Sequence, residues 1–464
     1  MKSLHYIQLL AITMILAAGC RKNDLQTNVT PITVVVKANY SEKISSDFTL
    51  KDIKVTLKNT MNRTELTEPT DKNGISVFSN IASGVYEVKA TIEVDKATYE
   101  RITGHTIQTE TGTLNGSLPA RSLNPSSNNS LEMQLDMGKI GEWVFKQIYY
   151  AGSNGTNGAS FRDQFIEIYN NTDEVLYADS LYFGALTGNN TKFTIVDLSK
   201  GYFLDNDSYE LHKQFNWGMS IGMVPADANA YKNFVYMKSL FRIPGNGKTY
   251  PVQPGASIVI AATALNHKAP YVGTDNKPVN IKDPSLTIDL QNADFEVYLG
   301  NVVPNPFGSD IDNLNVPNMV VIEPDNRDLI LDATGRDAYV IFKTDKAIPV
   351  FGSTDPKGYQ KYPDPSVKVV DASTTVFYQI PNSDIIDAVQ IQNPNPTATA
   401  RVARKLVNAL DAGPVYVPDG QYSSQSLIRK TFKTVNGRRI LMDTNNSLND
   451  FDFFPLANPK GFKN

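Results

Sequence analysis

The amino-acid sequence predicts an all-β protein of two β-sandwich domains, the second of which carries large loop insertions that include a short helix. Two observations lead to this fold class. Short segments rich in β-branched residues, such as 32–38 and 53–58, alternate with the period of a strand and are separated by turn residues. Helical spacing of apolar residues stands out in one segment, 400–410.

The first twenty residues indicate export and a lipid anchor. Lys2 gives a positive start, Leu9 to Leu16 form an apolar core, and small residues lead to Cys20. This pattern resembles the bacterial lipoprotein signal. The resemblance implies that residues 1–19 are a cleaved signal peptide, that Cys20 is lipidated and that residues 20–30 are a tether. A plain secretory signal with an incidental cysteine is the alternative, and the apolar run is too short to span a bilayer.

Composition limits what the rest of the chain can be. Its 464 residues include 44 Lys and Arg against 48 Asp and Glu, a net charge of −4. This weak acidity gives no electrostatic footprint for nucleic acid. Cys20 is the single cysteine, so an exported chain would have no internal disulfide. Burial alone must stabilise the fold, which a chain of this length can achieve when it is divided into domains.

The first domain is expected at residues 31–137. Asp71 to Gly74 form a turn in which glycine supplies a positive φ, and Gly84 opens the next strand. The run "T-D-x-x-G … G-x-Y-x-V" that these residues carry resembles carboxypeptidase-regulatory-like and Cna-B-like β-sandwich modules, which implies a stalk or spacer. A polar loop at 123–130 precedes a last strand at 131–135, and residues 138–141 are the expected linker.

The second domain, expected at residues 142–464, opens with the strand 143–150. The segments 165–174, 252–261, 426–430 and 443–451 resemble, in order, those of the lamin-tail domain, an immunoglobulin-like sandwich. They are separated by extra length at about 187–250 and 264–425, which we interpret as insertions. The whole chain also resembles a Bacteroidetes lipoprotein family of unknown function, DUF4876. That resemblance implies a location and an architecture but no activity.

The predicted helix at 400–410 lies in the second insertion. Pro396 precedes it and Gly413 ends it. Its basic face, with Arg401, Arg404 and Lys405, is expected to be solvated, and contact with lipid headgroups or an acidic partner is the alternative.

Few residues suggest chemistry, and we predict no catalytic residue and no cofactor. His105, His212 and His267 stand far apart without the spacing of a zinc site. No serine lies in a G-x-S-x-G turn. Acidic pairs can bind calcium or act in glycoside cleavage. The calcium candidates are Asp205 with Asp207 and Asp310 with Asp312, although solvated loop turns explain such pairs equally well.

The first insertion is rich in aromatic residues. Trp217, Phe215, Tyr231 and Tyr236 are candidates for a partner or ligand surface, because aromatic side chains with a polar tip are favoured there. The alternative is that these side chains bury the insertion against the sandwich.

Together these features predict a non-enzymatic accessory lipoprotein of the outer membrane. Its bilayer contact would be the acylated Cys20, and its body would face the periplasm or the cell surface. The family resemblance suggests docking to a TonB-dependent uptake receptor. A surface adhesin or envelope-structural protein is the first alternative, and a hydrolase with a carboxylate pair is the second.

Overall fold

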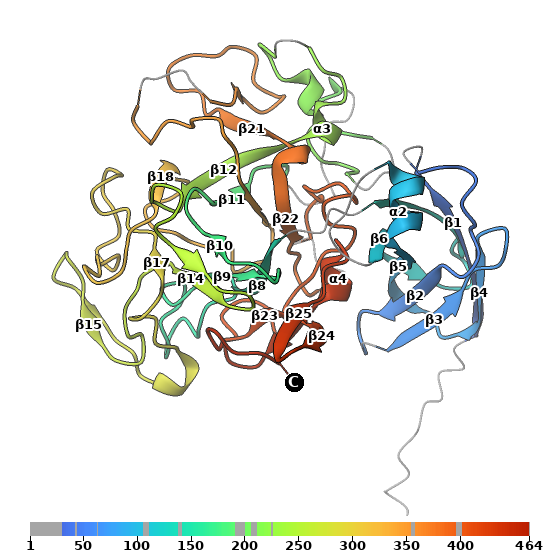
Figure 1. The fold of residues 1–464 in the computed structure, drawn as a ribbon, viewed down its shortest axis with the longest axis horizontal. Helices are drawn as coiled ribbons and strands as arrows, with labels where there is room; N and C mark the ends of the chain where they lie inside the picture. The colour runs from blue at the N-terminus through green and yellow to red at the C-terminus, as the bar shows by residue number, and fades with distance from the viewer. Residues whose placement is uncertain are drawn as a thin grey trace, which may run out of the picture.

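The structure is a computed structural model that describes residues 30–41, 44–62, 64–104, 111–137, 142–190, 200–205, 211–223, 226–353, 358–395 and 401–463. Two bodies lie side by side, a smaller one from the first third of the chain and a larger one from the rest (Figure 1). Cys20, His105, Asp207 and the predicted linker 138–141 lie outside the described residues.

The smaller body is built on a seven-stranded sheet in the order β3-β2-β5-β6-β7-β1-β4. Side chains of β1, such as Val34 and Val36, share one buried core with Val55 and Leu57 of β2. The sheet therefore folds back on itself as a sandwich. Its strands are β1 (Ile32–Tyr40), β2 (Lys54–Asn59), β3 (Glu65–Pro69), β4 (Ile75–Ile81), β5 (Gly84–Asp95), β6 (Thr111–Leu123) and β7 (Ser130–Met137), and helix α2 (Lys96–Thr103) joins β5 to β6.

The predicted turn before β4 has a clear local cause. Oδ1 of Asp71 accepts hydrogen bonds from the amides of Asn73 (2.8 Å) and Ile75 (2.9 Å). Gly74 has a φ of 76°, which a side chain would strain. The expected strand start at Gly84 is also present, since β5 begins there.

The larger body packs two sheets face to face. The first is six-stranded, in the order β17-β14-β9-β8-β23-β26. Phe145 of β8 and Ile168 of β9 share a buried core with Phe183 and Ile341 of the opposing sheet. The strands of the first sheet are β8 (Trp143–Tyr149), β9 (Phe165–Asn170), β14 (Ser257–Ala261), β17 (Phe295–Glu296), β23 (Ser426–Arg429) and β26 (Phe451–Phe454).

The opposing sheet runs in the order β20-β21-β12-β11-β19-β22, with β18 paired to β12. Its strands are β11 (Tyr182–Leu186), β12 (Phe234–Arg242), β18 (Val320–Glu323), β19 (Ala338–Phe342), β20 (Lys361–Tyr362), β21 (Phe377–Pro381) and β22 (Ile385–Gln390). All of them except β11 come from the two inserted regions. The insertions therefore supply strands of the sandwich as well as loops.

The remaining elements are short. Two-residue pairs form between β10 (Leu176–Tyr177) and β13 (Pro251–Val252) and between β15 (Tyr271–Val272) and β16 (Pro278–Val279), and β24 (Thr431–Val435) with β25 (Arg438–Leu441) forms a hairpin. Short helical turns are α3 (Ala230–Asn233), α4 (Ser447–Asp450) and the 3₁₀ turns η2 (Trp217–Met219), η3 (Pro284–Leu286) and η4 (Asn382–Asp384). No helix within the described residues has the length and apolarity needed to cross a membrane.

The all-β class is confirmed, but the predicted helix at 400–410 is wrong over its described part. Residues 401–410 have no regular structure. Arg401, Arg404 and Lys405 are 5%, 4% and 7% exposed, so the expected solvated basic face is also wrong. These side chains bond to distant segments on different sides, among them Glu87 of the smaller body. A helix would turn one of its faces toward water and lose those contacts.

Candidate functional site

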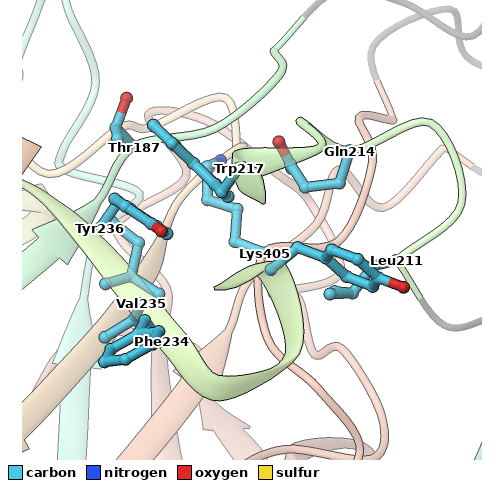
Figure 2. A pocket seen from close by; sticks show the side chains of 10 residues that line it. Thr187, Leu211, Gln214, Trp217, Phe234, Val235, Tyr236 and Lys405 are labelled. Carbon is cyan, nitrogen blue, oxygen red and sulfur yellow. The ribbon is translucent and has the colours of Figure 1, made fainter. Parts of the chain in front are cut away.

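The aromatic residues of the first insertion form a cluster beside β12. Trp217 stacks on Tyr236 with ring centroids 3.6 Å apart and planes 10° apart (Figure 2). Phe215 meets the indole edge-on at 5.4 Å between centroids. Trp217 and Tyr236 are 4% and 2% exposed. Neither is therefore available as an exposed anchor, which corrects that expectation. Phe215 and Tyr231 are half-buried and pack on the same cluster.

A small cavity lies between this cluster and Lys405. Its volume is about 10 Å³, at the lower limit for one water molecule. Burial lowers the pKa of Lys405 to about 8, and its Nζ donates to Oδ1 of Asn190 at 2.8 Å and to the Arg336 carbonyl. A solute of ordinary size does not fit here. The cluster therefore fastens the insertion to the sandwich.

Exposed apolar side chains gather instead on the loops above the cluster. Met219 and Ile221 of the first insertion are 51% and 41% exposed, and Val369 and Val370 of the second are 74% and 50% exposed. We call these four residues the loop-end patch. Both loops lie at the same end of the larger body, beyond β12 and β21 (Figure 1).

Two contacts hold the loops of the loop-end patch together. Oγ of Ser220 donates to the Pro363 carbonyl at 3.0 Å. Nζ of Lys368 lies 3.7 Å from the centre of the Tyr202 ring. Exposed apolar side chains on loops that are tied together in this way are candidates for an interaction surface. The sequence signal was the aromatic cluster, which turns out to be the support beneath the patch.

The described candidate calcium ligands lie in different surroundings. Asp205 is exposed and its partner Asp207 lies outside the described residues. Asp310 is 1% exposed, too buried for a substrate to reach. Half-buried Asp312 accepts from Nδ2 of Asn318 at 2.9 Å. Within the described ranges no three His, Cys, Asp or Glu side chains lie together as a group of metal ligands.

Within the described part of the chain, His212 and His267 belong to no group of metal ligands. His267 is fully buried, and burial lowers its pKa to about 4, while its Nε2 lies 2.9 Å from the Thr263 carbonyl. A neutral, buried imidazole is consistent with a structural role. His212 lies in the first insertion, far along the chain from His267.

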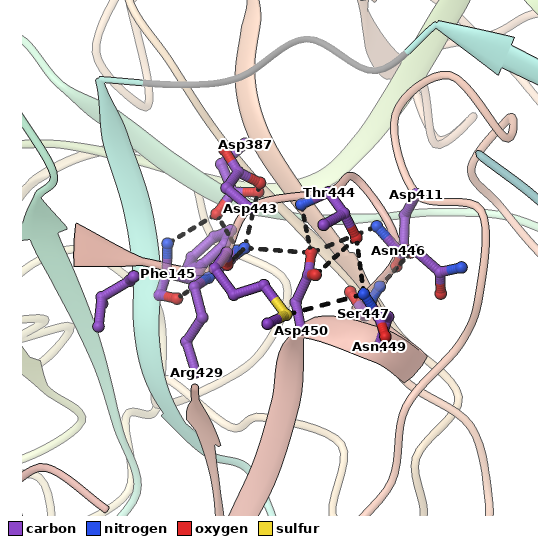
Figure 3. A network of polar contacts seen from close by, with 12 residues as sticks. Phe145, Asp387, Asp411, Arg429, Asp443, Thr444, Asn446, Ser447, Asn449 and Asp450 are labelled. Carbon is purple, nitrogen blue, oxygen red and sulfur yellow. Dashed lines mark hydrogen bonds and ion pairs between the residues drawn. The ribbon is translucent and has the colours of Figure 1, made fainter. Parts of the chain in front are cut away.

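A network of charges that the sequence patterns did not predict is centred on Arg429 of β23 (Figure 3). Its guanidinium lies 2.5 Å from Oδ2 of Asp387, 3.1 Å from Oδ1 of Asp443 and 3.5 Å from Oδ2 of Asp450. It also donates to the Phe145 carbonyl at 2.7 Å. All four charged side chains are at most 3% exposed. The signal was present in the segments 426–430 and 443–451, which both bring residues to this point.

The network places three carboxyl groups around one guanidinium. Burial, with the charge of Asp443, raises the pKa of Asp387 and of Asp450 to about 7 against the opposing effect of Arg429. Thr444 satisfies Asp450 through its amide (2.9 Å) and its hydroxyl (2.6 Å). The carboxylates and the guanidinium bond to one another and to neighbouring groups inside the fold. The network therefore joins β8, β22 and β23 to the segment 443–450.

Fold and sites together define a protein of two β-sandwiches with a buried network of charges and with exposed apolar residues on two of its inserted loops. Residues 253–455 match the model of a family described as protein of unknown function, DUF4876. The resemblance to that family is thus confirmed over these residues. No curated protein matches the chain.

Solved structures give further likenesses. A DUF4876 family protein from Bacteroides thetaiotaomicron VPI-5482 is 25% identical, with 91% of this chain and 95% of that chain covered and a TM-score of 0.47. A proposed adhesin from Bacteroides ovatus ATCC 8483 is 8% identical, with 79% and 88% covered and a TM-score of 0.19. A DUF3823 family protein from Parabacteroides merdae ATCC 43184 is 9% identical, with 35% and 67% covered and a TM-score of 0.13. Function is therefore argued from the chain's own residues.

Proposed function

We propose that the chain is a non-enzymatic docking lipoprotein of the outer membrane, and that its loop-end patch is the surface that meets a protein partner. The observation that carries this proposal is the exposure of Met219, Ile221, Val369 and Val370 on two loops held by a rigid sandwich. The cavity below them, of about 10 Å³, favours a protein partner over a small solute.

The partner we propose is a TonB-dependent outer-membrane receptor. This choice rests on the resemblance of the signal segment and of the family to Bacteroidetes surface lipoproteins. An adhesin would use the same patch toward a surface outside its own envelope. The two functions differ in where the partner resides, so the identity of the captured protein separates them.

The anchor would keep the body close to the bilayer. The chain from Cys20 to Ile32, where β1 begins, reaches about 40 Å when it is fully extended. A lipidated Cys20 would therefore hold the smaller body near the membrane surface. The larger body, with its patch, follows it in the chain.

The patch is tested by cross-linking the tagged protein in its native membrane and identifying what is captured. We expect Met219→Asp and Val369→Asp each to reduce capture of the receptor about tenfold, because a charge placed in a desolvated contact is costly. Their melting temperatures should stay unchanged, since both side chains are exposed.

Leu314→Asp is the matched control. Leu314 is 90% exposed and lies in the loop between β17 and β18, away from the patch. It should leave capture intact. Equal capture by the patch variants and this control would contradict the proposed surface.

The anchor is tested separately with Cys20→Ser. Without the thiol no lipid can be attached, so the variant should appear in the soluble fraction or remain uncleaved. Fractionation followed by mass measurement of the amino-terminal peptide distinguishes these results. A processed variant that is still found in the membrane fraction would refute the lipid anchor.

A further inference from the structure

Two loops of the second insertion bring a pair of aspartates into the protein interior. The amide of Asp310 donates to the Phe307 carbonyl at 3.0 Å, and the Phe307 amide donates to the Arg327 carbonyl at 3.1 Å. The loop before Asp310 therefore lies beside the loop before Asp328. The two aspartates are 1% and 2% exposed.

Three of the four carboxylate oxygens of this pair are open. Oδ2 of Asp310 accepts from the Leu299 amide at 2.9 Å. Its Oδ1 and both oxygens of Asp328 are buried without a hydrogen bond of acceptable geometry to any described residue. Buried polar atoms in folded proteins nearly always have a partner. The charge of Asp310 acts on Asp328, and three open oxygens on these two buried side chains indicate a missing ligand.

The surrounding charges make the open pair costly. Burial, with the charges of Glu296 and Asp312, raises the pKa of Asp310 to about 7, against the opposing effect of the Leu299 amide. Burial, followed by the charge of Asp310, raises the pKa of Asp328 well above its ordinary value, while the Leu329 amide and Arg162 lower it. Buried carboxylates of like charge ionise only when a cation compensates them.

We propose that Asp310 and Asp328 bind a calcium ion that bridges their carboxylates. A single shared proton would form one O–H···O bond and engage two of the three open oxygens. A cation can ligate all three and balance both charges. This site revises the predicted pair, because Asp328 rather than Asp312 is the second ligand.

The other ligands would be main-chain carbonyls and water. Glu296 is already engaged, since its oxygens accept from the amides of Ala264 (2.8 Å) and Asn313 (2.7 Å). No third acidic, histidine or cysteine side chain within the described residues joins the pair in a metal-binding group.

Calcium accepts six to eight oxygens in irregular geometry, whereas magnesium demands an octahedral shell and retains several waters. A buried site lined by irregular loops therefore suits calcium. The stretch between β17 (Phe295–Glu296) and β18 (Val320–Glu323) contains no strand. A bound ion would link this stretch to the loop that follows β18.

The test uses the full mature chain, dialysed against chelator. We expect calcium chloride to raise its melting temperature by several degrees and magnesium chloride to raise it much less, because a ligand that binds only the folded state stabilises it. Terbium provides a second measurement. Tyr271 donates to the Ser309 carbonyl at 3.3 Å, close enough to sensitise terbium luminescence that calcium should then quench.

Asp328→Asn should abolish both signals, because it removes the unpartnered carboxylate without changing its size. Asp325→Asn is the matched control, since Asp325 lies on the same loop but pairs with Lys238 at 3.2 Å. It should retain both signals. If calcium, magnesium and chelator leave the melting temperature of the wild type unchanged and terbium gives no luminescence, the proposal is overturned and a shared proton satisfies the pair. Calcium stabilisation that persists in Asp328→Asn would overturn it as well.

Discussion

The indole of Trp217 and the phenol ring of Tyr236 are stacked with their centroids 3.6 Å apart. This contact packs the first insertion against β12. We expect Trp217→Ala to lower the free energy of unfolding by about 3–5 kcal/mol, because it empties a packed aromatic site. Urea unfolding measures this. Met219→Ala, two residues away and 51% exposed, should change stability by less than about 0.5 kcal/mol. Equal effects of the two changes would place the indole outside the core.

Arg429 is the second residue on which the larger body depends. Its guanidinium lies at ion-pair distance from Asp387, Asp443 and Asp450. Arg429→Met would remove this shared cation from the buried carboxylates. We expect a loss of about 3–5 kcal/mol in the free energy of unfolding, measured with urea at pH 7. A loss below about 1 kcal/mol would show that the carboxylates are satisfied without it.

The same network predicts a dependence on pH. The pKa of Asp450 is about 7 in the fold, above its ordinary value of 3.8, so the folded state holds this proton more tightly than the unfolded state. The stabilisation is complete below the unfolded pKa and is lost as the pH rises through 7. We expect the free energy of unfolding to fall by about 1 kcal/mol between pH 6 and pH 8 for each such group. Asp450→Asn should flatten this slope relative to the wild type, and an identical slope in both would contradict the assignment.

At the scale of elements, the strands that the sequence predicted correctly have a recognisable local sequence pattern. The segments 143–150, 165–174, 252–261 and 426–430 contain β8, β9, β14 and β23, neighbours in one sheet. Two-residue strands such as β10 and β20 carry no such pattern, because their partners across the sheet define them. The helix predicted at 400–410 is wrong over residues 401–410 for the same reason, because distant contacts and not the local pattern determine the structure of this segment. Its apolar spacing is helical, but contacts with Glu87 and Asp411 decide its path.

The larger body is expected to need strand β23 in order to fold. It lies between β8 and β26, and all of its residues are buried. We expect a chain that ends at residue 425 to fail to fold, because β8 would lose its neighbour and Arg429 would be absent. Circular dichroism and limited proteolysis measure this. Shortening the β24–β25 hairpin, whose residues 432–435 are exposed, should be tolerated. A compact, protease-resistant product ending at 425 would show that the last segment is dispensable.

At the scale of the whole molecule, the two bodies meet through buried charges that no local pattern revealed. Nη2 of Arg401 lies 3.1 Å from Oε1 of Glu87, with side chains 7% and 3% exposed. Nζ of Lys89 donates to Oδ1 of Asn449 at 3.3 Å, beside the Arg429 network. The sequence predicted two domains joined only by a linker at 138–141. These contacts instead suggest that docking stabilises the smaller body against the larger one.

Arg401→Met should loosen this contact, because Glu87 would remain buried without its cation unless the bodies separate. We expect a larger radius of gyration in solution scattering and faster proteolysis between residues 137 and 142. Adding Glu87→Gln should restore part of the compactness, since it removes the unpaired charge. Arg101→Met is the control, because Arg101 pairs with Asp47 at the surface, 53% and 65% exposed, where an ion pair contributes little. If Arg401→Met scatters like the wild type and the double variant adds nothing, the two bodies are held together by other contacts and the ion pair does not fix their arrangement.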